Sequence, residues 1–240
     1  MSRPEPTRPL DNRLPVDRAT AVARLTGIGK KIAYGAWYLA FAALSVQIAE
    51  HAFTFLSQRP TGPRDVFGLK FALQGIDVPL HFFGAGLALL LGILQASSWV
   101  RRRWPALHRI GGWLSAAAIL VGGVSGLSMS FHAYGGWRSG LGFFLAGVLW
   151  MATAAYGIRC AVMGDYAAHR RWMLRCMAVT YAGVTLRLIL PMSFVFKLPF
   201  ESVYIFAAWA CWSVNLMICE LWLRWPAWRH QRRLLAVSRA

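Results

Sequence analysis

The stretch HRRWMLR at residues 169–175 opens the segment that decides the fold, which continues through Thr180 and Arg187 to Pro191. Beyond its basic start the segment is apolar, as a membrane-spanning helix is, yet it carries Arg175 and Arg187. An ionisable side chain inside the hydrocarbon layer is costly, and it marks a functional or architectural site. The sequence therefore predicts a membrane helix whose two arginines require partners elsewhere in the chain.

The composition of the whole chain indicates a membrane protein. Of its 240 residues, 57% are hydrophobic and 14% are aromatic, and the mean hydropathy is +0.45. Soluble domains of this size are usually less apolar. The net charge of +17 is concentrated in short segments between apolar runs. We therefore attribute this charge to membrane orientation and expect no nucleic-acid binding.

Six apolar segments are each long enough to cross a hydrocarbon layer of about 30 Å. They lie near residues 32–57, 79–100, 109–134, 139–163, 171–196 and 200–224. They predict an all-α integral membrane bundle of six transmembrane helices over residues 32–224. Residues 1–31 form a basic N-terminal tail, in which residues 16–31 suit either an interfacial helix or an unstructured chain. Residues 225–240 form a basic C-terminal tail.

The distribution of Arg and Lys predicts the orientation of the bundle. Nineteen of these residues lie in the two tails, at Arg224 and in the connections at 101–109 and 159–171, against five on the other side. Because positive charge is retained inside, both termini should be cytoplasmic, in a bacterial inner membrane. We expect anionic lipids of the cytoplasmic leaflet as partners, and a membrane protein or a second copy as further candidates. The first 31 residues lack the apolar core of a cleavable signal peptide.

Several common chemistries lack their sequence motifs. The cysteines all lie within apolar segments: Cys160, Cys176, Cys211 and Cys219. There is no CxxC or CxxCH motif, so we expect neither a disulfide framework nor a covalently attached haem. The histidine boxes of membrane di-iron oxygenases, the GxSxG elbow and the P-loop are also missing from the sequence.

Polar residues fall into two clusters when each is given a depth from the helical rise of about 1.5 Å per residue. The outer cluster contains Glu50, His51, Asp77, His81, His132 and Arg187. The inner cluster contains His108, Arg109, His169, Arg170, Arg171, Arg175 and Glu220. Since a buried ion needs a partner, the shared depths predict two ion pairs. These are Arg187 with Glu50, and Arg175 with Glu220.

Asp77 has two possible roles at the start of the second span. It precedes Val78-Pro79, so it could be the N-cap of that helix, which is the role we favour. Alternatively, it could orient His81 as the carboxylate partner of a ligating imidazole.

Histidines at two depths of a helix bundle are what b-type haems require. The candidate axial pairs are His81 with His132 outside and His108 with His169 inside. Because His108 and His132 are about 36 Å apart on one helix, a single outer haem or metal on two of His51, His81 and His132 fits as well as two haems. A quinone site is the neighbouring option. If they have no such function, His108 and His169 are interfacial anchors.

The following segments together resemble a bacterial family of predicted polytopic membrane proteins of unknown function. They are His81 with Gly84, LLLGILQ at 89–95, RRWPALHRIG at 102–111, HRRWMLR at 169–175 and VTLRL at 184–188. The similarity covers roughly residues 35–200. It implies the helical fold and no established activity. A more distant likeness to transmembrane di-haem cytochromes b rests on architecture and histidine placement alone.

These observations favour a membrane redox protein that carries electrons by means of haem b or a quinone. The candidate cofactor-binding residues are His51, His81, His108, His132 and His169, with His81 and His132 as the candidate metal ligands. The alternative is a non-catalytic accessory subunit or assembly factor whose buried charges hold the bundle together. The outer histidines distinguish the two, because a purely structural bundle has little reason to place three imidazoles at one depth.

Overall fold

The structure is a computed structural model that describes residues 18–57 and 75–237, with side chains at 28–29, 32–56 and 75–225. These residues form helices and turns and contain no strand. Six helical segments are long and apolar enough to span a membrane, namely Ile32–Leu56, Asp77–Ala96, Pro105–Ser130, Trp137–Val162, Tyr166–Val195 and Phe200–Trp225. The predicted all-α fold with six spans is confirmed. Most of the long connection at 58–78 lies outside the described residues.

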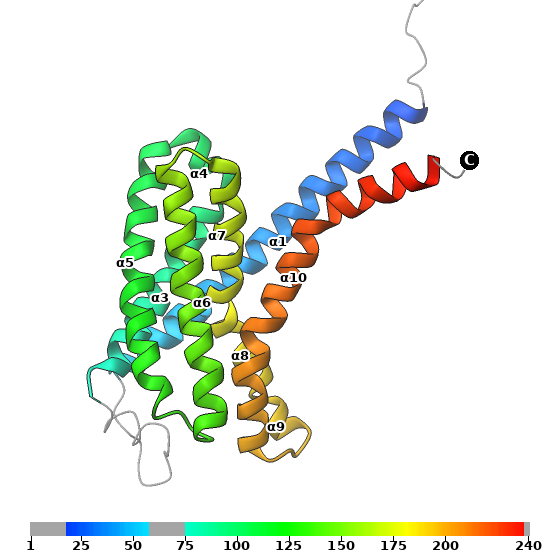
Figure 1. Cartoon of the computed structure of the whole chain (residues 1–240). Coiled ribbons are helices and arrows are strands. Elements are labelled where there is room, and N and C mark those ends of the chain that lie inside the picture. Colours follow the sequence, from blue (N-terminus) through cyan, green and yellow to red (C-terminus); the bar gives the residue numbers. More distant parts are fainter. Residues whose placement is uncertain (1–17, 58–74, 238–240) are drawn as a thin grey trace, which may run out of the picture. The chain divides into compact units, whose positions relative to one another are not determined.

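The helices follow one another without intervening strands in the part of the chain that is described (Figure 1). They are α1 (Arg18–Ser57), α3 (Asp77–Ala96), α4 (Ser98–Arg103), α5 (Pro105–Ser130), α6 (Trp137–Val162), α7 (Tyr166–Thr180), α8 (Ala182–Ile189), α9 (Met192–Val195) and α10 (Phe200–Val237). Residues 18–31 belong to α1, so they continue the helix of the first span instead of forming a separate one. Similarly, α10 continues past Arg224 to Val237.

The chain divides into two compact units, residues 1–41 and residues 42–240. In the first unit, aromatic rings follow one another along α1, with ring centroids 6.4 Å apart for Tyr34 and Trp37 and 5.4 Å apart for Trp37 and Phe41. The second unit contains the rest of α1 and all the other helices. Every site described below lies in this second unit.

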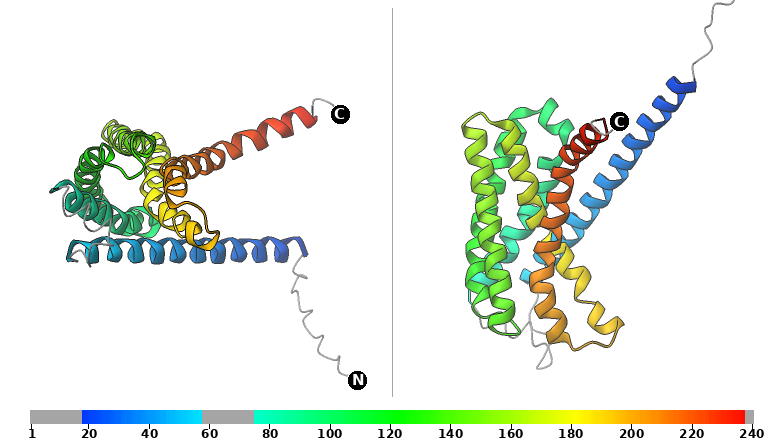
Figure 2. Two further views of the ribbon diagram at one scale, coloured as in Figure 1. Left: turned by 90° about the horizontal axis from the view of Figure 1, so that it is seen from below. Right: turned by 45° about the vertical axis from the view of Figure 1, so that its right-hand side comes forward.

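Four helices of the second unit form a bundle around a common axis (Figure 2, left). Helix α3 packs against α5, α5 against α6, and α6 against α7, while α3 also touches α7. Helices α5 and α7 are therefore at opposite corners. Helix α10 packs outside this bundle, against α6, α7 and α8. We call the end where α5 and α7 begin the basic end, since Arg101, Arg102 and Arg103 lie beside it.

Small residues bring α3 and α5 unusually close together. A Cβ atom added to Gly84 would lie 2.6 Å from the backbone nitrogen of Gly122, so only glycine fits there. The centre of the bundle is filled by Trp150 of α6, whose Nε1 donates a hydrogen bond to Oγ1 of Thr180 on α7 at 2.8 Å. Trp150 thereby links helices on two sides of the bundle.

The fifth span is broken at Tyr181 into α7, α8 and α9, whereas the hydrophobic pattern predicts one helix over 171–196. Backbone groups released by a break inside a membrane need new partners. Asn215 of α10 supplies one such partner, because its Nδ2 donates to the Ala178 carbonyl at 3.1 Å. Its Oδ1 accepts from the side-chain hydroxyl of Thr185 at 3.0 Å. The Tyr181 hydroxyl also shares a hydrogen bond with Oγ of Ser45. The break is thus stabilised by polar side chains of two neighbouring helices.

Candidate functional site

His169 lies in the first turn of α7 at the basic end. Its helix begins after a turn in which Gly164 has a φ of +79°, and the Asp165 side chain caps it by accepting from the Ala168 nitrogen at 2.8 Å. The Nδ1 of His169 lies 2.8 Å from the Gly157 carbonyl oxygen on α6. Because a carbonyl oxygen only accepts, Nδ1 carries the proton in this bond, and Nε2 keeps its lone pair.

His108 lies at the start of α5, in the opposite corner of the bundle. Its Nδ1 is buried and has no hydrogen-bond partner among the residues described, and it is close enough to His169 and Arg101 for their charges to act on it. Buried polar atoms of this kind are normally paired. His108 of α5 and His169 of α7 therefore lie at the same end of the bundle, on helices at opposite corners.

Gln95, at the end of α3, completes the polar group at the basic end. Its side chain lies against α5, because a Cβ atom on Gly111 would be 2.6 Å from its Nε2. That Nε2 is also buried without a described hydrogen-bond partner. All four helices of the bundle thus place a polar group at the basic end. We call Gln95, His108, Gly157 and His169 the basic-end cluster.

At the opposite end, His81 of α3 packs onto the glycine face of α5. Its Nδ1 lies 2.7 Å from the Gly122 carbonyl oxygen, and a Cβ atom on Gly126 would be 2.8 Å from the same nitrogen. The carbonyl again fixes the proton on Nδ1 and leaves Nε2 available. His81 and His169 are therefore held in the same way by helix backbones at the two ends of the bundle.

Asp77 does not have the N-cap role that the sequence favours. Helix α3 begins at Asp77 itself, and its N-cap residue is Ile76. The Asp77 carboxylate accepts hydrogen bonds from the Val78 nitrogen and from Oγ of Ser128, both at 2.9 Å. Its charge acts on His81, but it makes no hydrogen bond to that ring within the described structure. Asp77 therefore ties α3 to α5 and influences His81 only at a distance.

Arg187 does not form the predicted ion pair with Glu50. Its Nη1 donates to the Gly183 carbonyl oxygen, one turn earlier in α8, at 3.0 Å, and Glu50 is exposed. The break at Tyr181 changes the direction of α8, so equal depth does not bring these two side chains together. Arg187 is instead close enough to act electrostatically on His51 and His81.

The remaining outer residue, His132, lies away from His81. His132 is exposed beyond the last residue of α5, whereas His81 packs beside Gly126. Six residues separate Gly126 from His132, which corresponds to about 9 Å along a helix axis. Within the described ranges, no three His, Cys, Asp or Glu residues are grouped so that they could hold a metal ion. The cysteines described are all free.

Arg175 and Glu220 form the ion pair that their shared depth predicts. Nε of Arg175 is 2.5 Å from Oε1 of Glu220, and Nη2 donates to Oε2 at 3.2 Å. The Arg175 guanidinium also lies over the Trp172 ring, 4.8 Å from its centroid. The pair connects α7 to α10 and is an architectural contact.

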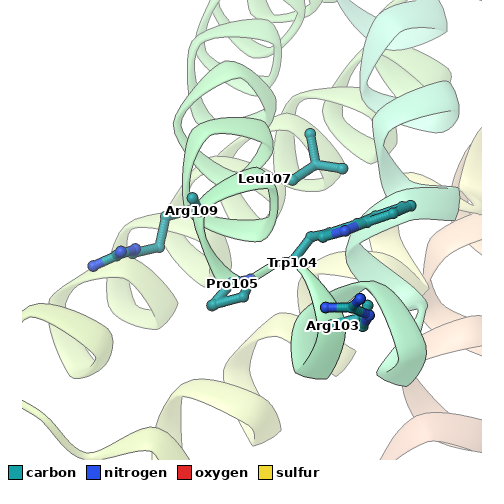
Figure 3. Close-up of a pocket in the computed structure, with 6 residues that line it drawn as sticks. Arg103, Trp104, Pro105, Leu107 and Arg109 are labelled. Atoms are coloured by element: carbon teal, nitrogen blue, oxygen red, sulfur yellow. The ribbon is translucent and has the colours of Figure 1, made fainter.

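An open surface recess of about 600 Å³ lies where α4 meets α5 (Figure 3). Its lining includes Arg103, Trp104, Pro105 and Arg109. The side chains of Arg103 and Arg109 point away from each other, so they do not converge on one ligand (Figure 3). This surface suits the general attraction of basic residues to anionic lipid headgroups that the sequence predicts.

Some residues of the site have no clear signal in the sequence. The carbonyls of Gly122 and Gly157 hold His81 and His169, and Gln95 joins the basic-end cluster. Glycines inside apolar helices suggest close packing, but their spacing alone does not indicate which side chain they receive. Gln95 is a polar residue at the end of an apolar run, and this position is the sequence feature that could have indicated its part in the site.

A family model described as "Predicted membrane protein (DUF2306)" matches residues 78–223. The match begins in α3 and ends in α10, and it therefore includes the four-helix bundle and both histidine-containing ends. Comparison with curated proteins and with solved structures gives no match. The matched region is more than half of the chain, so this multi-pass membrane protein belongs to the DUF2306 family of predicted membrane proteins of unknown function.

Proposed function

We propose that this protein is a membrane redox protein that holds one haem b at its basic end, with His108 and His169 as axial ligands. The observation that supports the proposal is that His108 of α5 and His169 of α7 lie at the same end of the bundle, on helices at opposite corners. A b-type haem in a helix bundle takes its two axial histidines from facing helices. When bound, the haem would supply one-electron transfer between ferrous and ferric iron.

The hydrogen bonding of the cluster supports this assignment. A ligating histidine commonly donates its other ring N–H to a backbone carbonyl, which fixes the tautomer and the ring orientation. His169 has this arrangement with Gly157, which leaves the lone pair of Nε2 available to a ligand. His108 Nδ1 and Gln95 Nε2 are buried and unpaired among the described residues, as polar groups at an incomplete binding site are.

The charge of the surroundings also suits haem b. Arg109 directly follows His108, and Arg170 and Arg171 directly follow His169. These three arginines are exposed at the basic end, where guanidinium groups can bind the propionate carboxylates of a haem. Trp150 and Thr180 fill the bundle deeper inside, so the cofactor would lie near this membrane face. The outer histidines are not required for this site.

The test is the visible spectrum of the purified full-length protein, recorded oxidised and after dithionite reduction. We expect a haem b band in the wild-type protein and its loss in His108→Ala and in His169→Ala. His132→Ala is the matched control, because that exposed histidine lies beyond α5, and it should keep the band. His169→Met, which retains a possible axial ligand, should shift the spectrum without abolishing it.

Three outcomes would contradict the proposal in different ways. A band that survives in both alanine variants would place the haem elsewhere, such as at His81. A co-purifying quinone without any haem would move the redox chemistry to a quinone. Neither haem nor quinone, in a folded protein that still binds a membrane partner, would favour the non-catalytic accessory subunit.

A further inference from the structure

The recess at the corner between α4 and α5 has the size of a ligand site. It has a volume of about 600 Å³ and opens at the surface of the bundle (Figure 3). Trp104, Pro105, Ala106 and Arg109 are among the residues that line it. Sites that hold small molecules usually have volumes of about 300 to 1,000 Å³. The recess is therefore large enough for the head group of a lipid.

Several contacts fix the shape of this corner. The Ser97 hydroxyl caps α4 by accepting a hydrogen bond from the Val100 nitrogen at 3.3 Å, and Val100 is buried. The Trp104 nitrogen donates to the Val100 carbonyl at 2.8 Å. The Trp104 ring also meets that of Trp99 edge-on, with ring centroids 4.7 Å apart. The recess is therefore part of the folded corner and does not need a ligand in order to form.

Arg109 lies at the beginning of an exposed apolar face of α5. Trp113, Leu120 and Val124 follow it by 4, 11 and 15 residues, so all four lie on one side of the helix. All four are exposed, and the three apolar residues lie within the span Pro105–Ser130. Because lipid surrounds a membrane span, this face of α5 contacts acyl chains. An acyl chain that lies along it reaches Arg109 at the basic end.

The charge of the corner is complementary to an anion. Four arginines lie within residues 101–109, at positions 101, 102, 103 and 109. Helices α3 to α6 have a single carboxylate, that of Asp77, which lies at the opposite end of the bundle and accepts a hydrogen bond from Ser128. Basic side chains at the membrane surface attract anionic lipids. The corner is at this level, because the span Pro105–Ser130 begins there.

We propose that this corner binds one anionic phospholipid, with its phosphate on Arg109 and its head group in the recess. The planar guanidinium would bind two phosphate oxygens, as it does in other phosphate sites. One acyl chain would lie along Trp113, Leu120 and Val124. Arg103 takes no part, because it lines the same recess but points away from Arg109 (Figure 3). The site thus depends on one arginine and on the recess, and not on the positive charge of the basic end as a whole.

This lipid site does not depend on the proposed haem. Arg109 is one of three arginines that could bind haem propionates, and Arg170 and Arg171 remain for that role when Arg109 binds a lipid. The two ligands also differ in mass. A measurement that weighs the intact protein with its ligands therefore reports the presence of each one separately, so the failure of one proposal is distinguishable from the failure of the other.

The experiment is native mass spectrometry of the full-length protein in detergent, supplied with equal amounts of phosphatidylglycerol and phosphatidylcholine that have the same acyl chains. Diacylglycerol with these chains tests the need for a phosphate, and glycerol phosphate tests the need for the chains. We expect one phosphatidylglycerol to be retained about fivefold or more over phosphatidylcholine. Diacylglycerol and glycerol phosphate should not be retained.

The variant Arg109→Gln should lower the retention of phosphatidylglycerol by about fivefold or more. Arg103→Gln is the matched control, because it removes the same charge from the same recess, and it should retain the lipid like the wild-type protein. Ala106→Phe fills the recess and leaves every charge in place, so it should also weaken retention. Arg109→Lys should keep part of the affinity, since it keeps the charge and loses the two-pronged geometry.

Equal retention of phosphatidylglycerol and phosphatidylcholine by the wild-type protein would overturn the proposal, since it would indicate ordinary surrounding lipid. Equal losses in Arg109→Gln and Arg103→Gln would do so as well, because the attraction would then be that of the whole basic end. Retention of glycerol phosphate would exclude the part of the acyl chain. If Arg109→Gln fails to fold, the lipid comparison in the wild-type protein and the Ala106→Phe variant still decide the question.

Discussion

Arg175 on α7 and Glu220 on α10 form an ion pair with two hydrogen bonds, of 2.5 and 3.2 Å. The two side chains are 22% and 30% exposed, so the pair is neither fully buried nor a surface contact. Arg224 also lies 3.3 Å from Glu220, but its side chain is 66% exposed. Of the two contacts of Glu220, the ion pair with Arg175 is therefore the one that connects α10 to the bundle.

Glu220→Gln should lower the stability of the protein. Exposed pairs contribute about 0.2 to 1 kcal/mol, and loss of a buried partner costs about 3 to 5 kcal/mol. For this half-buried pair we expect a loss of about 1 to 2 kcal/mol, because Arg175 keeps its contact with Trp172. Thermal unfolding in detergent measures this loss of stability. Arg224→Gln is the control and should change stability little; an equal loss in both variants would contradict the assignment.

Gly84→Ala should be strongly destabilising. The new methyl group would lie 2.6 Å from the Gly122 nitrogen and 2.7 Å from the Ala118 oxygen, so α3 and α5 would have to separate. We expect a loss of about 2 kcal/mol or more, in the range of overpacked cores. In Gly112→Ala the nearest atom is Oε1 of Gln95 at 3.6 Å, an ordinary contact. That control should be neutral or slightly stabilising, and similar unfolding temperatures for both variants would argue against the close approach.

The fold could be predicted from the sequence to a large extent because a membrane simplifies the problem. Length and hydropathy identify each span, and the six predicted spans agree with those of the structure to within a few residues. The break at Tyr181 could not be predicted in this way. It depends on Asn215, in another helix, which supplies hydrogen bonds to both sides of the break. Hydropathy is a property of each segment alone, so it does not predict a contact between distant parts of the chain.

The candidate site could be predicted in depth but not in rotation about the helix axes. Shared depth correctly predicts the ion pair of Arg175 with Glu220. The pairing of His108 with His169 stays a prediction. Shared depth also predicts a pair of Arg187 with Glu50, and that pair is not formed. Depth in the membrane does not say which way a side chain faces around its helix axis. In addition, Arg187 lies in α8, beyond the break at Tyr181, and not in the continuous helix that the prediction assumes.

Asn215→Leu should destabilise the broken span. The substitution removes the donor to the Ala178 carbonyl and the acceptor for Thr185, and it leaves both in an apolar environment. An unsatisfied buried group costs about 1 to 3 kcal/mol. Hydrogen exchange of the α7–α8 segment should increase, and the unfolding temperature should fall. Ser213→Ala, on the exposed side of α10, removes only a bond to Trp209 in the same helix and should leave both unchanged.

The orientation with the basic end in the cytoplasm can be tested by cysteine labelling. Trp137, at the start of α6, is 75% exposed, and Met163, just after its end, is 69% exposed. A membrane-impermeant maleimide should label Trp137→Cys in intact cells, because that end of α6 faces outwards if positive charge is retained inside. It should label Met163→Cys only after permeabilisation. The wild-type protein measures the background from its own cysteines, and the reverse labelling pattern would invert the predicted orientation.

Trp150 and Thr180 should be energetically coupled, since their side chains form a hydrogen bond between α6 and α7. Trp150→Phe and Thr180→Val each remove this bond, and the Thr180 hydroxyl additionally donates to the Cys176 carbonyl of its own helix. Hydrogen bonds between membrane helices have coupling energies of about 0.6 kcal/mol on average and up to about 1.7 kcal/mol. A double-mutant cycle followed by thermal unfolding should give a value in this range.

As a control, Ser115→Ala removes only a bond to Gly111 within α5, so its effect should add to that of Trp150→Phe without coupling. A coupling near zero for Trp150 and Thr180 would mean that the indole stabilises the bundle through its volume alone.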